Sequence, residues 1–241
     1  MENFDPLSSF GPDVAARYDD ELRGDEDDTV AFLASLADGR PACELAVGTG
    51  RIALPLAAAG VEVCGIDQSR AMLDRLRARP GGERVRVVRG DMASEAPEGT
   101  FGLVYLVFNT IGNVLTQQGQ VDVFRNAASR LDDDGVFVVE NAVPWQTFGR
   151  TQFVEAERVT GDEVVLDVNR FDPTTQLLSE NHVTLSADGV RMGPIAQRLT
   201  TPAELDLMAR VAGLTLRERY GGWRREPFTP ASPLHVSVWG R

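Results

Sequence analysis

The sequence is poor in basic residues, in cysteine and in histidine, and each shortage argues against a class of function. The 241 residues carry 24 lysines and arginines against 36 aspartates and glutamates, which gives a net charge of −12. Nucleic-acid-binding surfaces need a basic footprint to neutralise phosphates, so no RNA or DNA partner is expected. The two cysteines, Cys43 and Cys64, fall in expected core strands, where cysteine behaves as a small apolar residue. A structural disulfide is therefore not expected, and a reducing cytoplasm is the default compartment.

Long apolar runs are absent as well. The sequence contains no run of about 18 apolar residues, so no membrane span is expected. Residues 1–6 lack the basic and apolar regions of a secretory signal peptide. The length suits one large domain, or one domain with an insertion. The expectation is a cytoplasmic globular protein whose partners include neither nucleic acid nor membrane.

The most informative feature is a strand, a glycine turn and a helix over residues 42–59. The strand carries Glu44, the turn contains Gly48 and Gly50, and the helix follows from Arg51. Glycine tolerates positive φ and lets the backbone approach a ligand, and the helix offers unpaired N–H groups. This pattern indicates a cradle for a nucleoside-type cofactor. A purely structural turn is the alternative.

The turn alone does not choose the cofactor. Gly48-Thr-Gly-Arg-Ile-Ala53 fits the dinucleotide fingerprint, and Asp67 ends the next strand, 19 positions after Gly48. A carboxylate in that position can accept hydrogen bonds from both ribose hydroxyls. NAD(P) and S-adenosylmethionine (SAM) are therefore both open at this point.

Further motifs separate the two cofactors. A third strand ends in Gly90-Asp91-Met92, and a fourth is followed by Phe108-Asn-Thr-Ile-Gly112. With the glycine turn and Asp67-Gln68-Ser69-x-x-Met72, their order and spacing resemble class I SAM-dependent methyltransferases. Within them, the chain is similar to the amino-sugar N,N-dimethyltransferases of bacterial secondary metabolism. A dehydrogenase pattern does not explain the Gly-Asp-Met element.

The resemblance implies SAM as cofactor and assigns residues to its parts. Asp67 would bind the ribose, Asp91 the adenine amine and the Met92 backbone a ring nitrogen, while Tyr18 would meet the methionine carboxylate. Ala46 stands where the family more often has a first glycine. The full set of expected cofactor-binding residues is Tyr18, Glu44, Ala46, Gly48, Gly50, Asp67, Gln68, Met72, Asp91, Met92 and Val107.

The fold class expected is α/β. Alternating strands and helices over residues 42–141 argue for a parallel sheet covered by helices on both faces. The resemblance implies a Rossmann-like, seven-stranded, mostly parallel sheet whose last strand is antiparallel. Strand and hairpin signals over residues 153–200 predict an antiparallel β insertion, and Thr201-Pro202 restarts the α/β pattern. The predicted division is a helical cap (1–40), a SAM-binding core (41–150), an insertion (151–200) that covers substrate or supplies a homodimer surface, and a core completion (201–241).

Methyl transfer needs positioning more than strong acid–base chemistry. Glu140, which ends the fifth strand, and His182, in the insertion, are the candidates for a base, whereas His235 is expected to be a hydrogen-bonded strand histidine. No metal is expected, because Asn109 and Glu140-Asn141 replace the acidic ligands of metal-dependent relatives. Candidate substrate-facing residues are Asn109, Asn113, Trp145, Tyr220 and Trp223.

The sequence therefore predicts a SAM-dependent methyltransferase that acts on a nitrogen or oxygen of a small-molecule acceptor. The alternatives are an NAD(P)-dependent oxidoreductase, which lacks a recognisable catalytic Tyr/Lys arrangement here, and a non-catalytic SAM-binding module.

Overall fold

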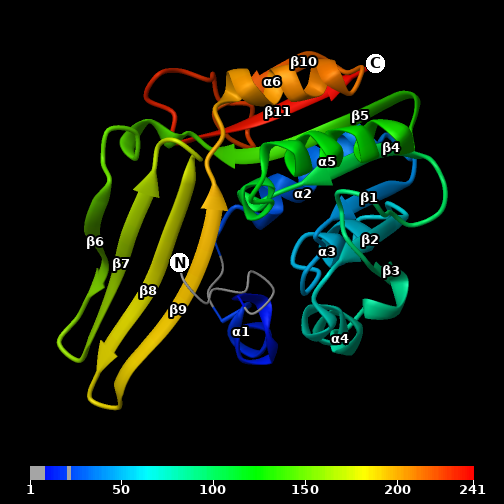
Figure 1. Ribbon diagram of the computed structural model, residues 1–241. Coiled ribbons are helices and arrows are strands. Elements are labelled where there is room, and N and C mark those ends of the chain that lie inside the picture. The colour runs from blue at the N-terminus through cyan, green and yellow to red at the C-terminus, as the bar shows by residue number, and fades with distance from the viewer. Residues whose placement is uncertain (1–8, 21–22) are drawn as a thin grey trace.

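A computed structural model describes residues 9–20 and 23–241 of the chain (Figure 1). The segment 1–6, where no signal peptide is expected, lies outside the described residues. The main sheet has seven strands in the order β10-β11-β5-β4-β1-β2-β3, and β11 is antiparallel to both of its neighbours. Its strands are β1 (Ala42–Leu45), β2 (Val63–Asp67), β3 (Arg86–Arg89), β4 (Phe101–Leu106), β5 (Leu131–Ala142), β10 (Thr215–Tyr220) and β11 (Leu234–Gly240). The expected Rossmann-like topology is confirmed.

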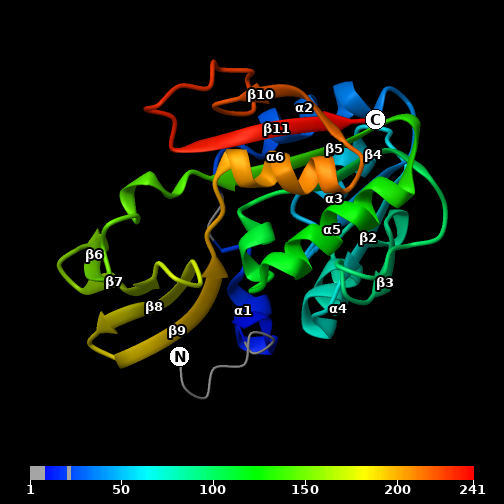
Figure 2. The ribbon, with the colours of Figure 1, turned by 45° about the horizontal axis from the view of Figure 1, so that its top comes forward.

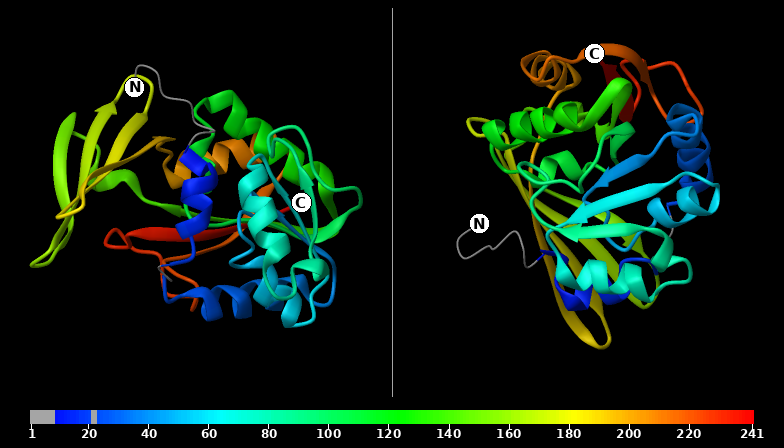
Figure 3. Two further views of the ribbon diagram at one scale, coloured as in Figure 1. Left: turned by 90° about the horizontal axis from the view of Figure 1, so that it is seen from below. Right: turned by 90° about the vertical axis from the view of Figure 1, so that its right-hand side faces the viewer.

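Helices cover both faces of this sheet, as Figure 3 shows. One face packs on α2 (Glu26–Ala37), α3 (Ala53–Ala58) and α4 (Arg70–Ala78), and the other packs on α5 (Gln117–Arg130) and α6 (Pro202–Val211). A short helix, α1 (Pro12–Arg17), and three 3₁₀ turns, η2 (Gly82–Arg84), η3 (Thr110–Asn113) and η4 (Pro144–Gln146), complete this part. Two apolar clusters, one on each face, bury β1, β2, β4 and β11 almost completely, whereas the edge strands β3 and β10 are partly exposed. In the described residues, no helix is long and apolar enough to cross a membrane.

Side-chain caps set where several helices begin. Ser69, Thr116 and Thr201 each accept a hydrogen bond from the backbone N–H three residues further on, at the starts of α4, α5 and α6. Such caps satisfy donors that would otherwise have no partner. The start predicted at Thr201-Pro202 is confirmed. The acidic run at residues 25–28 includes the first turn of α2, where negative charge complements the helix dipole.

The insertion is a separate four-stranded antiparallel sheet, sheet B, as predicted. Its order is β6-β7-β8-β9, with β6 (Gln152–Val159), β7 (Glu163–Asp172), β8 (Leu177–Ser186) and β9 (Gly189–Arg198). Figure 2 shows sheet B beside the core, joined to it by the segments after β5 and before α6. At the β9 end, the buried Arg198 guanidinium donates to Gln120 Oε1 and Glu204 Oε1, both at 2.6 Å. These charge-assisted bonds anchor sheet B to α5 and α6.

The two faces of sheet B have an unusual distribution of polarity. The inner face, turned to the core, holds the buried Val165, Phe171 and Leu178 near its ends, with polar and charged side chains between them. The outer face exposes a set of large apolar side chains: Val154, Val159, Val168, Leu185, Val190 and Met192. An antiparallel sheet with one free face normally turns its polar side to water. The outer face of sheet B therefore has the composition of an interface.

One strand start differs from the sequence prediction. In the sequence, the acidic residues 132–134 followed by an apolar run predict a polar turn and then a strand that starts at Val136. Instead β5 begins at Leu131, which pairs with Phe101, and the pairing resumes at Val136 with Leu103. Three residues of β4 (101–103) thus lie opposite six of β5 (131–136), so the acidic run forms a bulge in the strand.

Candidate active site

The glycine turn lies at the carboxyl end of β1, and its backbone needs positive φ at alternate positions. Ala46, Gly48 and Gly50 have φ of 54°, 56° and 76°. A Cβ on Gly50 would approach Leu76 Cγ to 2.9 Å, so this position has no room for a side chain. Ala46 adopts the left-handed conformation in place of the family's glycine. The turn therefore presents backbone instead of side chains in front of α3, as a cofactor cradle requires.

Asp67 is held directly against this turn. Its Oδ2 accepts from Gly48 N at 2.9 Å, and its Oδ1 accepts from Ser69 N at 2.7 Å. Burial raises the pKa of Asp67, and the two N–H donors oppose that shift. The end of β2 thus aims a fixed carboxylate at the turn, where the sequence predicts a ribose ligand.

The expected adenine side lies one strand further along. Gln68, Arg89, Gly90 and Asp91 line a shallow depression of about 380 Å³ between the ends of β2 and β3. Asp91 Oδ1 accepts from Ala93 N at 2.9 Å in a local turn. Two further predicted residues, Met72 and Met92, are buried, with 2% and 9% of their surface exposed, and Met92 is part of the apolar cluster under α5 and α6. The structure thus brings Gln68 and Asp91 together at the surface and places both methionines in the core.

The expected methionine side is lined by charged and aromatic groups. Tyr18 is surrounded by Arg51, Asp67, Glu44 and its neighbour Asp19, and burial raises the pKa of its phenol. The Arg51 guanidinium lies 5.9 Å from the Tyr18 ring centre. Its buried Nε has no hydrogen-bond partner within residues 9–20 and 23–241. A buried donor without a partner suits an anionic ligand group.

Glu44 is a buried carboxyl beneath the same turn. Its Oε2 accepts from the Tyr105 hydroxyl at 3.0 Å. Burial raises the pKa of Glu44 to about 8. At neutral pH the folded protein therefore keeps a proton on Glu44 that the unfolded chain has released.

This proton predicts a pH dependence of stability. Because the folded-state pKa of Glu44 is raised, its contribution to stability is complete below about pH 4 and is lost as pH rises toward 8. We expect Glu44→Gln, which mimics the neutral acid, to reduce the fall in unfolding free energy between pH 5 and pH 8 by a few kcal/mol. Urea denaturation at both pH values measures the difference. Identical pH slopes for the two proteins would show that Glu44 is ionised in the folded state.

A second polar group lies where β4 and β5 end. The Glu140 carboxylate is buried and binds Arg23 through two bonds, of 2.7 and 3.1 Å. Glu140 Oε2 also accepts from Phe108 N at 2.8 Å. The guanidinium groups of Arg23 and Arg51 both lie over the Phe108 ring, at 4.5 and 4.4 Å from its centre. Glu140 is thus fixed in position and already paired with a cation.

Backbone strain accompanies this arrangement. Phe108 and Asn109 are consecutive residues with positive φ, of 62° and 58°. Asn109 Oδ1 accepts from Ala142 N at 2.5 Å and so links the ends of β4 and β5. Residues held in this region cluster at active sites, where surrounding contacts maintain them. Val107, one of the expected cofactor-binding residues, immediately precedes this strained pair, and its carbonyl accepts from Thr110 Oγ1 at 2.7 Å.

The amino-terminal segment lies across the carboxyl edge of the sheet. Figures 1 and 3 show α1 between sheet B and α4. Phe10 O accepts from Ser69 Oγ at 2.6 Å, and Asp19 Oδ1 accepts from Thr49 Oγ1 at 2.7 Å. Together with the Arg23–Glu140 pair, these contacts tie Phe10, Asp19 and Arg23 to the ends of β2, β1 and β5.

Sequence reasoning missed Asp19, Arg23 and Arg51 as parts of this site. Arg51 directly follows the glycine turn, and that position was a signal for it. Arg23 stands before an acidic run, 117 positions from Glu140, so no local pattern could have paired them.

The other predicted residues lie further from this cluster. Trp223 and Tyr220 pack edge-on against Phe32 of α2, at 5.4 and 5.9 Å between ring centres. Trp145, 45% exposed, contacts Phe148 in the connection to sheet B. Asn113 closes η3, with a buried Oδ1 that has no partner among the described residues.

The two histidines lie in different environments. His182, on β8, lies between Asp167 and Glu180, and its hydrogen bond with Glu180, supported by Asp167, raises its pKa to about 9. His235 is fully buried, with Nδ1 2.8 Å from Ser237 Oγ, which agrees with the expected hydrogen-bonded strand histidine. Burial lowers the pKa of His235 to about 3, so it remains neutral at physiological pH.

Comparisons with known proteins agree with this geometry. Residues 42–135 match a family described as a methyltransferase domain. The structure superimposes on the CcbJ methyltransferase from Streptomyces caelestis with a TM-score of 0.92 and 38% identity, over 98% of this chain and 99% of the other. A curated relative, cypemycin N-terminal methyltransferase from Streptomyces sp., is 28% identical over 197 residues, which cover 81% of this chain and 80% of the relative. The SAM-bound amino pentose methyltransferase CalS10 from Micromonospora echinaspora shares the fold, with a TM-score of 0.67 and 20% identity over 94% of this chain and 95% of the other.

These relatives confirm SAM as the cofactor and give no support to the NAD(P)-dependent alternative. The cradle at Gly48–Gly50 and the carboxylate of Asp67 agree with such a cofactor. Because the similarity extends over nearly the whole chain, the protein belongs to the SAM-dependent methyltransferases of secondary metabolism.

Proposed function

We propose that the protein methylates an amine nitrogen of a small molecule. The observation that carries this choice is Glu140, a fixed carboxylate at the end of β5 that is already paired with Arg23. Such a carboxylate can orient an amine by accepting its N–H groups, and a neutral amine attacks before it loses a proton, whereas an alcohol needs a base during the attack itself. Relatives in the comparison support nitrogen, because one is named an N-terminal methyltransferase and another an amino pentose methyltransferase.

The residues present fit the cofactor at each of its ends. We assign the ribose hydroxyls to Asp67, the adenine edge to Asp91 with Gln68, and the methionine carboxylate to Arg51 with Tyr18. The unpartnered Arg51 Nε and the backbone opened at Gly48 and Gly50 support this assignment. Bound SAM supplies an electrophilic methyl group on a sulfonium. The protein then needs to hold the acceptor nitrogen in line at about 3–3.5 Å from that carbon.

The acceptor would lie between the ends of β4 and β5 and the inner face of sheet B. Asn109 joins those strand ends, and Trp145 precedes sheet B with an exposed ring. We propose that these two residues contact the acceptor. Tyr220, Trp223 and Asn113 would shape the surrounding wall.

A screen of amine and hydroxyl acceptors, scored by S-adenosylhomocysteine release, tests the function. Amines should turn over and the matched alcohols should not. Calorimetry with SAM, S-adenosylhomocysteine and NAD gives an independent check of the cofactor. SAM binding without turnover of any acceptor would favour a non-catalytic SAM-binding module, and turnover of alcohols alone would contradict the choice of nitrogen.

We further propose that the protein works in the cytoplasm as a homodimer joined through the outer face of sheet B. Both cysteines are free and buried, as suits a reducing compartment. Four strands of about ten residues present roughly 600 Å² at ordinary strand spacing. Two such faces would bury on the order of 1,200 Å², the lower end of the range for stable interfaces. The centre of the face is uncharged, so it can pair with a copy of itself.

A charge in this face should separate the subunits. We expect Val168→Glu, on the central strand β7, to convert dimer to monomer at micromolar concentration, because two-fold symmetry buries the carboxylate twice. Sedimentation velocity measures the change. Leu207→Glu is the matched control, since Leu207 is 58% exposed on α6, away from sheet B. A wild-type monomer, or a dimer that survives Val168→Glu, would contradict the proposal.

A further inference from the structure

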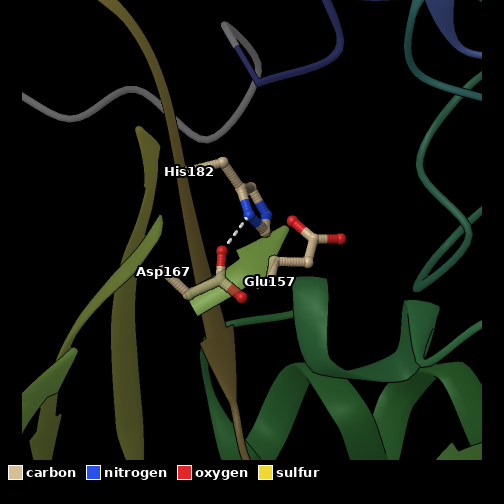
Figure 4. Close-up of side chains that lie close together, drawn as sticks. All are labelled: Glu157, Asp167 and His182. Carbon is tan, nitrogen blue, oxygen red and sulfur yellow. Dashed lines mark hydrogen bonds and ion pairs between the residues drawn. The ribbon is translucent and has the colours of Figure 1, made fainter. Parts of the chain in front are cut away.

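The inner face of sheet B carries a compact group of ionisable side chains. Glu157 on β6, Asp167 on β7 and His182 on β8 each place one ligand atom within 4.8 Å of the others, as Figure 4 shows. Two ligands on opposite sides of one metal ion lie about 4 Å apart, since each bond measures about 2.0–2.2 Å. Small side-chain rotations would therefore bring all three onto one ion.

The strand register explains why these residues meet. Asp167 and His182 are direct partners across β7 and β8, so their side chains share a face. On β6 the pairing shifts between Ala156 and Arg158, which makes Glu157 an extra residue in the strand. A bulge of this kind re-aims a side chain. Here it adds a third ligand to the pair.

The histidine ring is oriented by a fourth residue. His182 Nε2 lies 3.1 Å from Glu180 Oε1, and Nδ1 lies 2.5 Å from Asp167 Oδ1. Without a metal, the proton on Nδ1 is shared with Asp167. A metal ion would replace this proton and take the lone pair of Nδ1, while Nε2 keeps its proton and donates it to Glu180. Metal-binding histidines are typically oriented in this way, by a carboxylate on the opposite nitrogen.

A buried oxygen without a partner adjoins the cluster. Asn169 follows Asp167 by two residues, on the same inner face, and pairs with Glu180 across the strands. It is only 5% exposed, and its Oδ1 accepts no hydrogen bond from any described residue. Its Nδ2 donates to the backbone carbonyl of Asp167 at 3.1 Å, so the side-chain amide lies next to one of the proposed ligand residues. A buried amide oxygen of this kind needs a ligand, and amide oxygens bind cations or the waters around them.

We propose that Glu157, Asp167 and His182 bind one divalent transition-metal ion, with Glu180 orienting the imidazole and Asn169 accepting from a metal-bound water. One imidazole with carboxylates suits Zn²⁺ or Mn²⁺. The ion would join β6, β7 and β8 on the face that covers the acceptor and would take no part in methyl transfer. A ligated His182 has no lone pair for a proton, which leaves Glu140 as the base.

Calorimetric titration of the chelator-treated protein with ZnCl₂ and with MnCl₂ tests the site. We expect one ion per chain, and a loss of affinity of at least about 100-fold in His182→Ala and in Asp167→Asn. Glu180→Gln, which disturbs only the orientation of the ring, should cost about 10-fold. The matched control is Glu163→Gln on the same strand as Asp167, since Glu163 pairs with Arg158 at 2.7 Å and is not a proposed ligand.

Far-UV circular dichroism and SAM affinity establish that each variant is folded, and neither readout depends on bound metal. Absence of binding below about 1 mM metal, or equal affinity in wild type and His182→Ala, would overturn the proposal. If Glu163→Gln loses as much affinity as Asp167→Asn, the binding is a diffuse effect of acidic surface, and the proposed site is equally refuted.

Discussion

Replacing Asp67 by alanine is expected to weaken SAM binding by about 10- to 100-fold. A hydrogen bond that involves a charged group contributes about 1.5–3 kcal/mol, which corresponds to this range. The Asp67 carboxylate already accepts from Gly48 N and Ser69 N, so its removal also releases the glycine turn. Both effects lower cofactor affinity. Calorimetry with SAM measures the loss.

The control for this variant is Asp74→Ala. Asp74 lies on α4, exposed and paired with Arg77 at 3.3 Å, and has no contact with the turn. Glu26 is less suitable, since Glu26 Oε1 lies 3.9 Å from Arg51. Asp67→Asn separates the two causes, because an amide oxygen can still hold one N–H of the turn. Unchanged SAM affinity in folded Asp67→Ala would remove Asp67 from the cofactor site.

The cofactor half of the site was predictable because its residues are local to the ends of strands. Gly48, Asp67 and Asp91 each follow a short apolar strand, and parallel strands bring their carboxyl ends to one edge of the sheet. The positions of these residues in the sequence, each at the end of a strand, therefore predict that they lie close together in the fold. The same logic located Glu140 at the end of β5.

The acceptor half was less predictable, since it depends on contacts between distant segments. Arg23 precedes α2 and reaches Glu140 across 117 positions of the chain, and nothing in the acidic run after Arg23 indicates that partner. Sheet B poses a different problem. Its alternation predicts strands correctly, but alternation alone does not reveal which face meets the core. Val168 and Met192 would ordinarily be assigned to the buried side.

Glu140→Gln is expected to lower kcat about 100-fold and to leave SAM affinity unchanged. Glutamine keeps the shape and can still accept from Phe108 N, so the strained turn at Phe108 is retained. What it loses is the charge that would orient an amine and accept its proton. A supporting base contributes about 10²–10⁴-fold, and positioning supplies most of the remaining acceleration. Since the sulfonium leaving group departs neutral, no proton is needed on that side.

Arg23→Met is the matched control for this change. It removes the cation that pairs with Glu140 and leaves the carboxylate bonded to Phe108 N. Breaking this buried pair should cost about 3 kcal/mol of stability, measured by urea denaturation. The freed carboxylate should still support turnover, so kcat should fall less than in Glu140→Gln.

For an amine acceptor, activity should rise with pH until the amine is deprotonated. Complete loss of turnover in Glu140→Gln, with SAM and acceptor still bound, would instead mean that the base is obligatory, and an unchanged kcat would exclude Glu140 from proton removal.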